Sequence, residues 1–134
     1  MKFMHLFCYG TLVFPEIMRR VSGARTTGSP ATLAHFACYA VRGAVYPGII
    51  FEQGARIHGI VYDGITAAQL QRIDRYEGDD YVRQRVLVSE TDGRLCRAWA
   101  YVIRPGAVDR LTDECWDSAL FARHYLASYL REFA

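Results

Sequence analysis

The chain has 134 residues, of which 51% are hydrophobic and 22% charged, and its formal net charge is +2. This length suits one domain spanning residues 1–134, and the apolar share supplies one core, which excludes a disordered or fibrous chain. Basic residues alternate with acidic ones and form no stripe, so we expect no nucleic-acid partner.

The N-terminal apolar run is the one stretch that faintly resembles a targeting signal. It is interrupted by His5 and ends at Gly10, without the small-residue cleavage pattern of a signal peptide. No stretch approaches the roughly 20 apolar residues that a membrane span requires. We therefore expect a soluble, cytoplasmic protein without a membrane partner.

The first half of the chain predicts strands with one short helix. Residues 3–9 are nearly all apolar, which is typical of a central strand, and Pro15 to Gly23 has the start and stop residues of a helix. Residues 31–41 are strand-like. Residues 46–65 predict two strands around a turn at 52–55.

The second half predicts a helix, a hairpin and a C-terminal helix. Thr66 and Gln69 have capping-box spacing, and Gly78 follows the apolar positions of that helix. Asp92-Gly93 is a hairpin turn within residues 81–103. The region from Thr112 predicts one amphipathic helix, capped by that threonine. Its expected buried stripe is Ala119, Ala122, Leu126, Tyr129 and Phe133.

The order of these elements does not alternate strand and helix, which argues against a doubly wound parallel sheet. We predict an α+β fold in which a small mixed, barrel-like sheet of about six strands carries peripheral helices and a C-terminal helix.

The turn Tyr9-Gly10-Thr11-Leu12 is the first candidate site. A strand that ends in glycine just before a helix leaves backbone N–H groups without strand partners. Such groups can bind a carboxylate or phosphate, or stabilise an oxyanion during acyl transfer. A lone glycine after a strand is also a common plain turn. Beyond it, the ring at Tyr46-Pro47 can wall a pocket or simply pack.

Glu77 is the second candidate. It lies at the end of the predicted helix, where the helix dipole disfavours a negative charge, and Asp79 and Asp80 follow closely. Partial burial would add desolvation, and all three effects raise a carboxyl pKa toward the range of a general base at neutral pH. The alternative is an ordinary solvated loop carboxylate.

Cysteines and histidines give no metal or nucleophile pattern. The four cysteines have no C-x-x-C spacing, and Cys8, Cys38 and Cys96 lie in strand-like runs, so we expect reduced thiols. The histidines are scattered, without metal-ligand spacing. We therefore expect no metal and no cofactor.

Three stretches together carry a family resemblance. They are "LFCYGTL", "VYPGIIFEQGARIHGIVYDGI" and "LQRIDRYEGDDYVRQRVLV", in this order along the chain. The ordered set resembles the γ-glutamylcyclotransferase-like family, in the branch of plant avirulence-induced-gene products and γ-glutamylamine cyclotransferases. The resemblance implies a small α+β barrel-like fold.

The resemblance also implies a reaction and its residues. A γ-glutamyl amide or amine closes on itself by attack of its α-amine, which gives 5-oxoproline and a free amine. It implies that Glu77 is the catalytic acid/base and that Tyr81 hydrogen-bonds near the ligand. The family's substrate-contacting loop corresponds to Tyr9, Gly10, Thr11 and Leu12.

Two other functions stay open at this point. The first is a non-catalytic module of the same fold that binds a small carboxylate. The second, binding of single-stranded RNA by an aromatic sheet face, is disfavoured by the missing basic stripe. The amine half of the substrate (dipeptide, glutathione, γ-glutamylamine or cross-linked lysine) and the oligomeric state are also open.

Overall fold

The computed structural model describes residues 3–133, in which six strands, four α-helices and two 3-10 helices form. The elements, in chain order, are β1 Met4–Cys8, η1 Thr11–Val13, α1 Pro15–Ser22, β2 Gly28–Val41, β3 Pro47–Ile65, α2 Ala67–Glu77, β4 Tyr81–Glu90, β5 Leu95–Ile103, η2 Pro105–Arg110, β6 Leu111–Cys115, α3 Ser118–His124 and α4 Leu126–Arg131.

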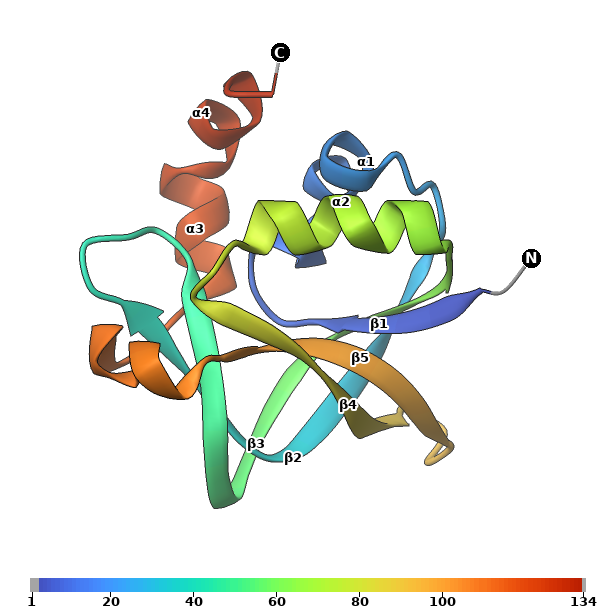
Figure 1. The fold of residues 1–134 in the computed structure, drawn as a ribbon, viewed down its shortest axis with the longest axis horizontal. Coiled ribbons are helices and arrows are strands. Elements are labelled where there is room, and N and C mark those ends of the chain that lie inside the picture. The colour runs from blue at the N-terminus through green and yellow to red at the C-terminus, as the bar shows by residue number, and fades with distance from the viewer. Residues whose placement is uncertain (1–2, 134) are drawn as a thin grey trace.

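Five of the strands close into a barrel. The sheet order is β3-β1-β5-β4-β2-β6, and β3 also pairs with β2, so β6 alone lies outside the closed ring (Figure 1). Strand β1 is antiparallel to β3 and parallel to β5, which makes the sheet mixed. The predicted α+β class with a mixed, barrel-like sheet of about six strands is confirmed.

Strand β1 is central, as its apolar run predicted. It is hydrogen-bonded on both sides, and its side chains alternate between two cores. Leu6 and Cys8 pack with residues of the helices, whereas Phe7 packs with side chains of the other barrel strands. Burial on both faces explains why this strand shows no polar alternation.

The prediction of two strands around a turn at 52–55 is wrong, because the two halves of this segment do not pair with each other. Strand β3 is one long bent strand, and both of its halves pair with β2. The register breaks opposite His35, which has φ of 67°, and the Gly54 N–H donates to the His35 Nδ1 at 3.1 Å. Both strands bend together at this corner of the barrel, as strands with irregular pairing do.

The local helix signals of the first two helices are confirmed. Helix α1 begins at Pro15, and Gly23 ends it with φ of 81°. At the start of α2 the Gln69 N–H donates to the Thr66 hydroxyl, while the Gln69 side chain accepts from the Thr66 N–H. Gly78 follows the last residue of α2 with φ of 82°.

The prediction of one C-terminal helix capped by Thr112 is wrong. Thr112 lies in β6, which pairs with β2, and the helical segment begins only after Asp117, whose carboxylate caps it. The segment breaks at Tyr125 into α3 and α4. Of the expected stripe, Ala119 and Ala122 are exposed, because the true buried face of α3 is centred elsewhere, on Phe121.

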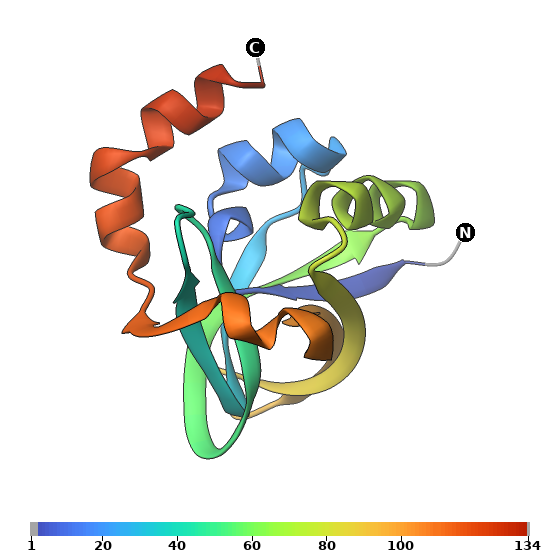
Figure 2. The ribbon, with the colours of Figure 1, turned by 60° about the vertical axis from the view of Figure 1, so that its left-hand side comes forward.

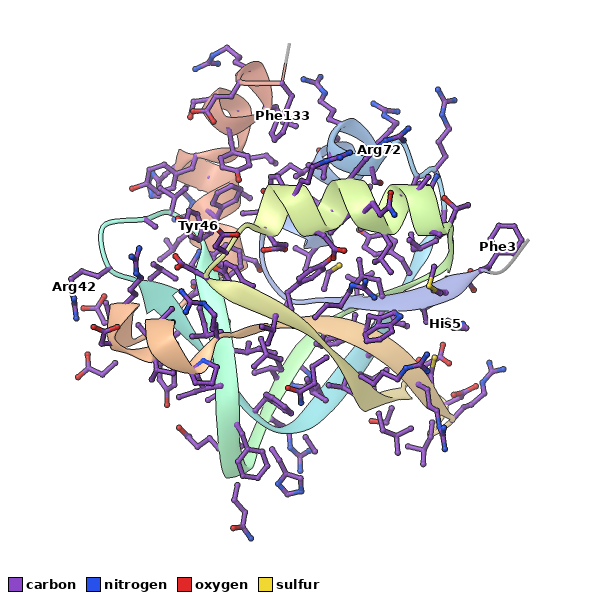
Figure 3. All side chains as sticks on the ribbon, in the orientation of Figure 1. Phe3, His5, Arg42, Tyr46, Arg72 and Phe133 are labelled. Atoms are coloured by element: carbon purple, nitrogen blue, oxygen red, sulfur yellow. The ribbon has the colours of Figure 1, made fainter. Side chains whose placement is uncertain are left out.

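The four α-helices gather on one side of the barrel, apart from the 3-10 helix η2. Figures 1 and 2 show α1 and α2 lying across this side, with α3 and α4 rising next to them as a bent arm. Tyr46 lies on the side of the C-terminal helices, whereas Phe3 and His5 lie at the opposite end of the molecule (Figure 3). Within residues 3–133, no helix combines the length and the apolar character that crossing a membrane requires.

Gly59 marks the closest approach of β3 to β1. A Cβ atom there would overlap the carbonyl oxygen of Cys8, so the two strands would have to move apart. We expect Gly59→Ala to lower the free energy of unfolding by about 1–3 kcal/mol, measured by urea denaturation. As the control, Gly106→Ala meets only the far end of the Arg104 side chain and no backbone atom, and a change within about 0.5 kcal/mol is expected. Equal effects of both variants would contradict the tight β1–β3 contact.

Candidate active site

The turn after β1 leads directly into the short helix η1. The Val13 N–H donates to the carbonyl of Gly10 at 3.1 Å, which closes the first turn of this helix. The amides that begin a helix have no acceptor within it, so those of Thr11 and Leu12 are available to a ligand. Gly10 permits close packing, because a Cβ there would lie 3.0 Å from the side chain of Pro47.

Two tyrosines fix the backbone around this turn. The Tyr9 hydroxyl donates to the carbonyl of Tyr101 in β5 at 2.6 Å. The Tyr62 hydroxyl, on β3, donates to the carbonyl of Leu12 at 2.8 Å. Both neighbours of β1 therefore hold the ends of the turn, and the barrel itself sets its position.

Glu77 and Tyr81 reach the same region from the junction of α2 and β4. Glu77 is the last residue of α2, and the Gly78 N–H closes the helix on the carbonyl of Asp74. Tyr81 begins β4, and its hydroxyl donates to the carbonyl of Pro47 at 2.6 Å. Pro47 therefore contacts both the glycine turn and Tyr81.

All six residues singled out from the sequence line one cavity of about 130 Å³. This volume exceeds the roughly 10–15 Å³ that one water molecule needs, so a small molecule fits. Among the described residues that line it there is no Lys, Arg or His. The lining comprises Phe7, Cys8, Tyr9, Gly10, Thr11, Leu12, Tyr46, Pro47, Tyr76, Glu77, Tyr81, Tyr101 and Tyr129. The roles of the six predicted residues stay a prediction.

Four of these lining residues are tyrosines that the sequence did not assign to the site. Tyr46 carried a weak signal, as an aromatic ring next to a strand kink. Tyr129 was expected only as a packing residue of the C-terminal helix, Tyr76 is the residue before Glu77 in α2, and Tyr101 lies in an otherwise ordinary strand. Their shared location comes from long-range folding, so periodicity within one element could not reveal it.

Burial raises the pKa of Glu77 to about 8, from an ordinary value of 4.5. The residue keeps part of its surface open to the cavity, but protein surrounds its carboxyl group on the other sides. Desolvation of the charged form is the largest cause, and the negative charge of Asp74 is the second. The expected rise of the pKa is therefore present.

The expected electrostatic neighbours of Glu77 were wrong. The charge that raises its pKa belongs to Asp74, one helical turn earlier, and not to the two aspartates that follow the helix. Asp79 is exposed. Asp80 lies 3.4 Å from the guanidinium of Arg110, which offsets its charge. Helical spacing of three residues brings Asp74 onto the face of Glu77.

Asp74 itself is held by two partners. It accepts a hydrogen bond of 2.6 Å from the Tyr101 hydroxyl, and two from Arg83 at 3.0 and 3.3 Å. The Arg83 guanidinium also lies 4.4 Å from the ring centre of Trp99. Arg83 thus partly compensates the charge that acts on Glu77.

The thiols and the metal prediction complete the description of the site. All four cysteines are free thiols, and burial raises the pKa of Cys8, the one that lines the cavity, well above its usual value. Within residues 3–133 no group of three or more His, Cys, Asp or Glu side chains has an arrangement that could hold a metal ion.

The negative charge of Asp74 is expected to contribute to the raised pKa of Glu77, and its removal tests this contribution. We expect Asp74→Asn to lower the Glu77 pKa, because it removes the nearby negative charge while Asn can still accept from Tyr101. The matched variant Asp79→Asn removes an exposed charge and should leave this pKa within about 0.3 units, since exposed charges are screened. A ¹³C NMR titration of the Glu77 carboxyl carbon measures both. A larger shift in Asp79→Asn would restore the expectation from sequence.

A family model and curated plant proteins match this chain. Residues 6–118 match the family model "Gamma-glutamyl cyclotransferase, AIG2-like". AIG2-like protein D of Arabidopsis thaliana is 34% identical over 90 residues, which are 66% of this chain and 59% of that protein. Protein AIG2 C of the same plant is 30% identical over 88 residues, 66% of this chain and 53% of that protein. The chain thus spans somewhat more than half the length of these relatives.

Solved structures show the same fold. A solution structure of an Arabidopsis thaliana protein superposes on this chain with a TM-score of 0.77 at 24% identity. The match covers 99% of this chain and 81% of the Arabidopsis chain. A structure named gamma-glutamyl cyclotransferase has a TM-score of 0.68 at 16% identity, covering 98% and 86%. At these identities the likeness concerns the fold alone. The match over residues 6–118 decides the family, and the chain belongs to the AIG2-like gamma-glutamyl cyclotransferases.

Proposed function

We propose that the protein is a γ-glutamylcyclotransferase that releases 5-oxoproline from a γ-glutamyl amide or amine. The observation that carries this proposal is the shared cavity of Glu77 and the Gly10–Leu12 turn, in which the Glu77 pKa is about 8. Membership of the family supports the same reaction type.

The raised pKa suits the proton transfer that this reaction requires. The substrate carries its own nucleophile, an α-amine next to a free α-carboxylate, so its pKa lies above the roughly 8 of a peptide α-amine. A carboxylate of ordinary pKa would be far too weak a base to take its proton. Because the raised Glu77 pKa lies much nearer to that of the amine, transfer between them costs less free energy.

The reaction balances without another reactant. Ionised Glu77 takes a proton from the α-ammonium, and the freed amine nitrogen forms a bond to the γ-carbonyl carbon. The leaving nitrogen receives this proton from Glu77 as its bond to the carbon breaks. The ring nitrogen still carries one proton too many, and it gives that proton through Glu77 to the released amine, which leaves as an ammonium ion while Glu77 is ionised again. The attack closes a five-membered ring, so holding the γ-glutamyl chain folded is a large part of the catalytic task.

In this proposal the other residues predicted from the sequence contact the substrate and take no part in proton transfer. The amides of the Gly10–Leu12 turn hold either the substrate carboxylate or the developing oxyanion. Tyr9 and Tyr81 have pKa values raised by burial, so both hydroxyls stay neutral while Glu77 titrates. Each hydroxyl already donates its one proton to a backbone carbonyl, that of Tyr101 or of Pro47, so a ligand meets both as neutral acceptors.

Replacement of Glu77 tests the acid/base role. We expect Glu77→Gln to lower 5-oxoproline release by about 10²–10⁴-fold, because an amide cannot accept the proton. The assay is chromatographic detection of 5-oxoproline from a panel of γ-glutamyl dipeptides, glutathione and γ-glutamylamines. Glu114→Gln, an exposed change in β6, is the control and should keep full activity. Near-normal turnover by Glu77→Gln would remove the assigned role.

The same variant makes a prediction for stability. Between pH 4.5 and about 8, Glu77 is ionised in the unfolded chain but protonated in the folded one, so the folded state binds more protons. The free energy of unfolding therefore falls as pH rises through this interval. Glu77→Gln does not titrate, and it should become more stable than the original protein by about 2–4 kcal/mol at pH 9, and equal to it near pH 4. Urea denaturation at both pH values measures this difference.

The pH dependence of catalysis follows from the same pKa. We expect kcat/KM to fall on the acid side of an apparent pKa near 8, where Glu77 becomes protonated. Asp74→Asn should move this acid limb to lower pH. An acid limb near the ordinary carboxyl value of 4.5 would contradict Glu77 as a base with a raised pKa.

The same panel of γ-glutamyl compounds distinguishes the enzyme from the alternative, a module that binds small carboxylates without any reaction. Binding by calorimetry without 5-oxoproline from any compound would favour the module. Turnover of even one compound would favour the enzyme.

A further inference from the structure

The C-terminal helix α4 contributes a side chain to the cavity although it lies beyond the family match, which ends at residue 118. Tyr129 projects from α4 and lines the cavity together with Glu77 and Thr11. Figure 2 shows that α3 and α4 lead away from the barrel and past α1. The helix that carries Tyr129 thus adds one side chain to a wall that the barrel strands, the glycine turn and helix α2 otherwise build.

A chain of three hydroxyls joins α4 to the glycine turn. The Tyr129 hydroxyl is hydrogen-bonded to that of Tyr76 on α2. The Tyr76 hydroxyl lies 2.7 Å from the hydroxyl of Thr11, the residue that follows Gly10. Thr11 is only 6% exposed, so its hydroxyl depends on a protein partner.

Other contacts hold Tyr129 in place without its hydroxyl. Its ring packs edge-on against Phe121, with ring centres 5.4 Å apart, and at a tilt against Phe133, with ring centres 5.8 Å apart. The Arg20 guanidinium, on α1, donates to the carbonyl of Leu130 at 2.8 Å. The helix therefore has its own anchors, and the hydroxyl of Tyr129 is free for a separate task.

We propose that Tyr129 is a positioning residue of the active site, which fixes the Tyr76 hydroxyl and through it the Thr11 hydroxyl next to the ligand-binding amides. With two partners, the Tyr76 hydroxyl has one orientation, and Thr11 has one role as donor or acceptor. Without Tyr129, Tyr76 has a single partner and can reorient. The catalytic part of this inference rests on the proposed function, but the structural part does not.

Tyr129→Phe tests the hydroxyl alone, because it keeps the ring and its packing. The control is Tyr125→Phe, which lies in the same segment, is 47% exposed and does not line the cavity. We expect kcat/KM for 5-oxoproline release to fall about three- to tenfold in Tyr129→Phe, the usual effect of one lost hydrogen bond. Tyr125→Phe should stay within twofold of the original protein.

Separate measurement of kcat and KM shows which of the two constants the Tyr129 hydroxyl affects, whereas a purely structural role would leave both unchanged. A rise in KM alone indicates that the turn holds the substrate carboxylate in the ground state, whereas a fall in kcat indicates that it holds the oxyanion. Either result supports the positioning role. Equal kinetics of the two variants would overturn it.

A second measurement is independent of any activity. In ¹H–¹⁵N NMR spectra of the full chain, the Gly10, Thr11 and Leu12 amide signals should shift in Tyr129→Phe and stay in place in Tyr125→Phe. Unchanged amide signals would disprove the connection from α4 to the turn. If the amides shift but no γ-glutamyl compound is turned over, the proposed function fails and the hydroxyl chain stands.

Discussion

Closure of the barrel between β2 and β3 is the constraint on which the site depends. Without this pairing β3 would be an edge strand next to β1, whereas with it β3 is hydrogen-bonded on both sides, as β1 and β5 are. The end of β1 is then fixed, with Tyr9 bonded to β5 and Leu12 bonded to Tyr62 of β3. The glycine turn is therefore positioned by the barrel, and only secondarily by its own residues.

Sequence reasoning succeeded where the cause lies within a few residues. The capping box of Thr66 and Gln69, the stop at Gly23 and the hairpin turn at Asp92-Gly93 are local hydrogen-bond and backbone effects, and the structure has all of them. It failed where distant segments decide. The corner at Gly54 exists because β2 bends opposite it, and residues 111–115 form a strand because an edge of β2 is available.

The site shows the same division. The end of a helix and a glycine turn are visible in sequence, so Glu77 and Gly10 could be chosen as candidates. The size of the pKa rise depends on desolvation by segments far along the chain, and its charge neighbour is Asp74, not Asp79. The four additional tyrosines of the cavity could not be predicted from the sequence either. Tyr129 and Tyr76, for example, are 53 positions apart, and only the folded chain brings their hydroxyls together.

Because the other titratable groups among the described residues that line the cavity are tyrosines and one cysteine, Glu77 is the only one of them that can change its charge near neutral pH. Burial raises the pKa values of Tyr76, Tyr81 and Tyr101, and of Cys8, so none of them becomes charged near neutrality. No cationic side chain lines the cavity within the described part of the chain, so no positive charge there is paired with an ionised Glu77 before a ligand arrives. An incoming ammonium group supplies that missing charge and favours ionisation of Glu77 as it binds. In the proposed reaction, the base is thereby formed only where the substrate is bound.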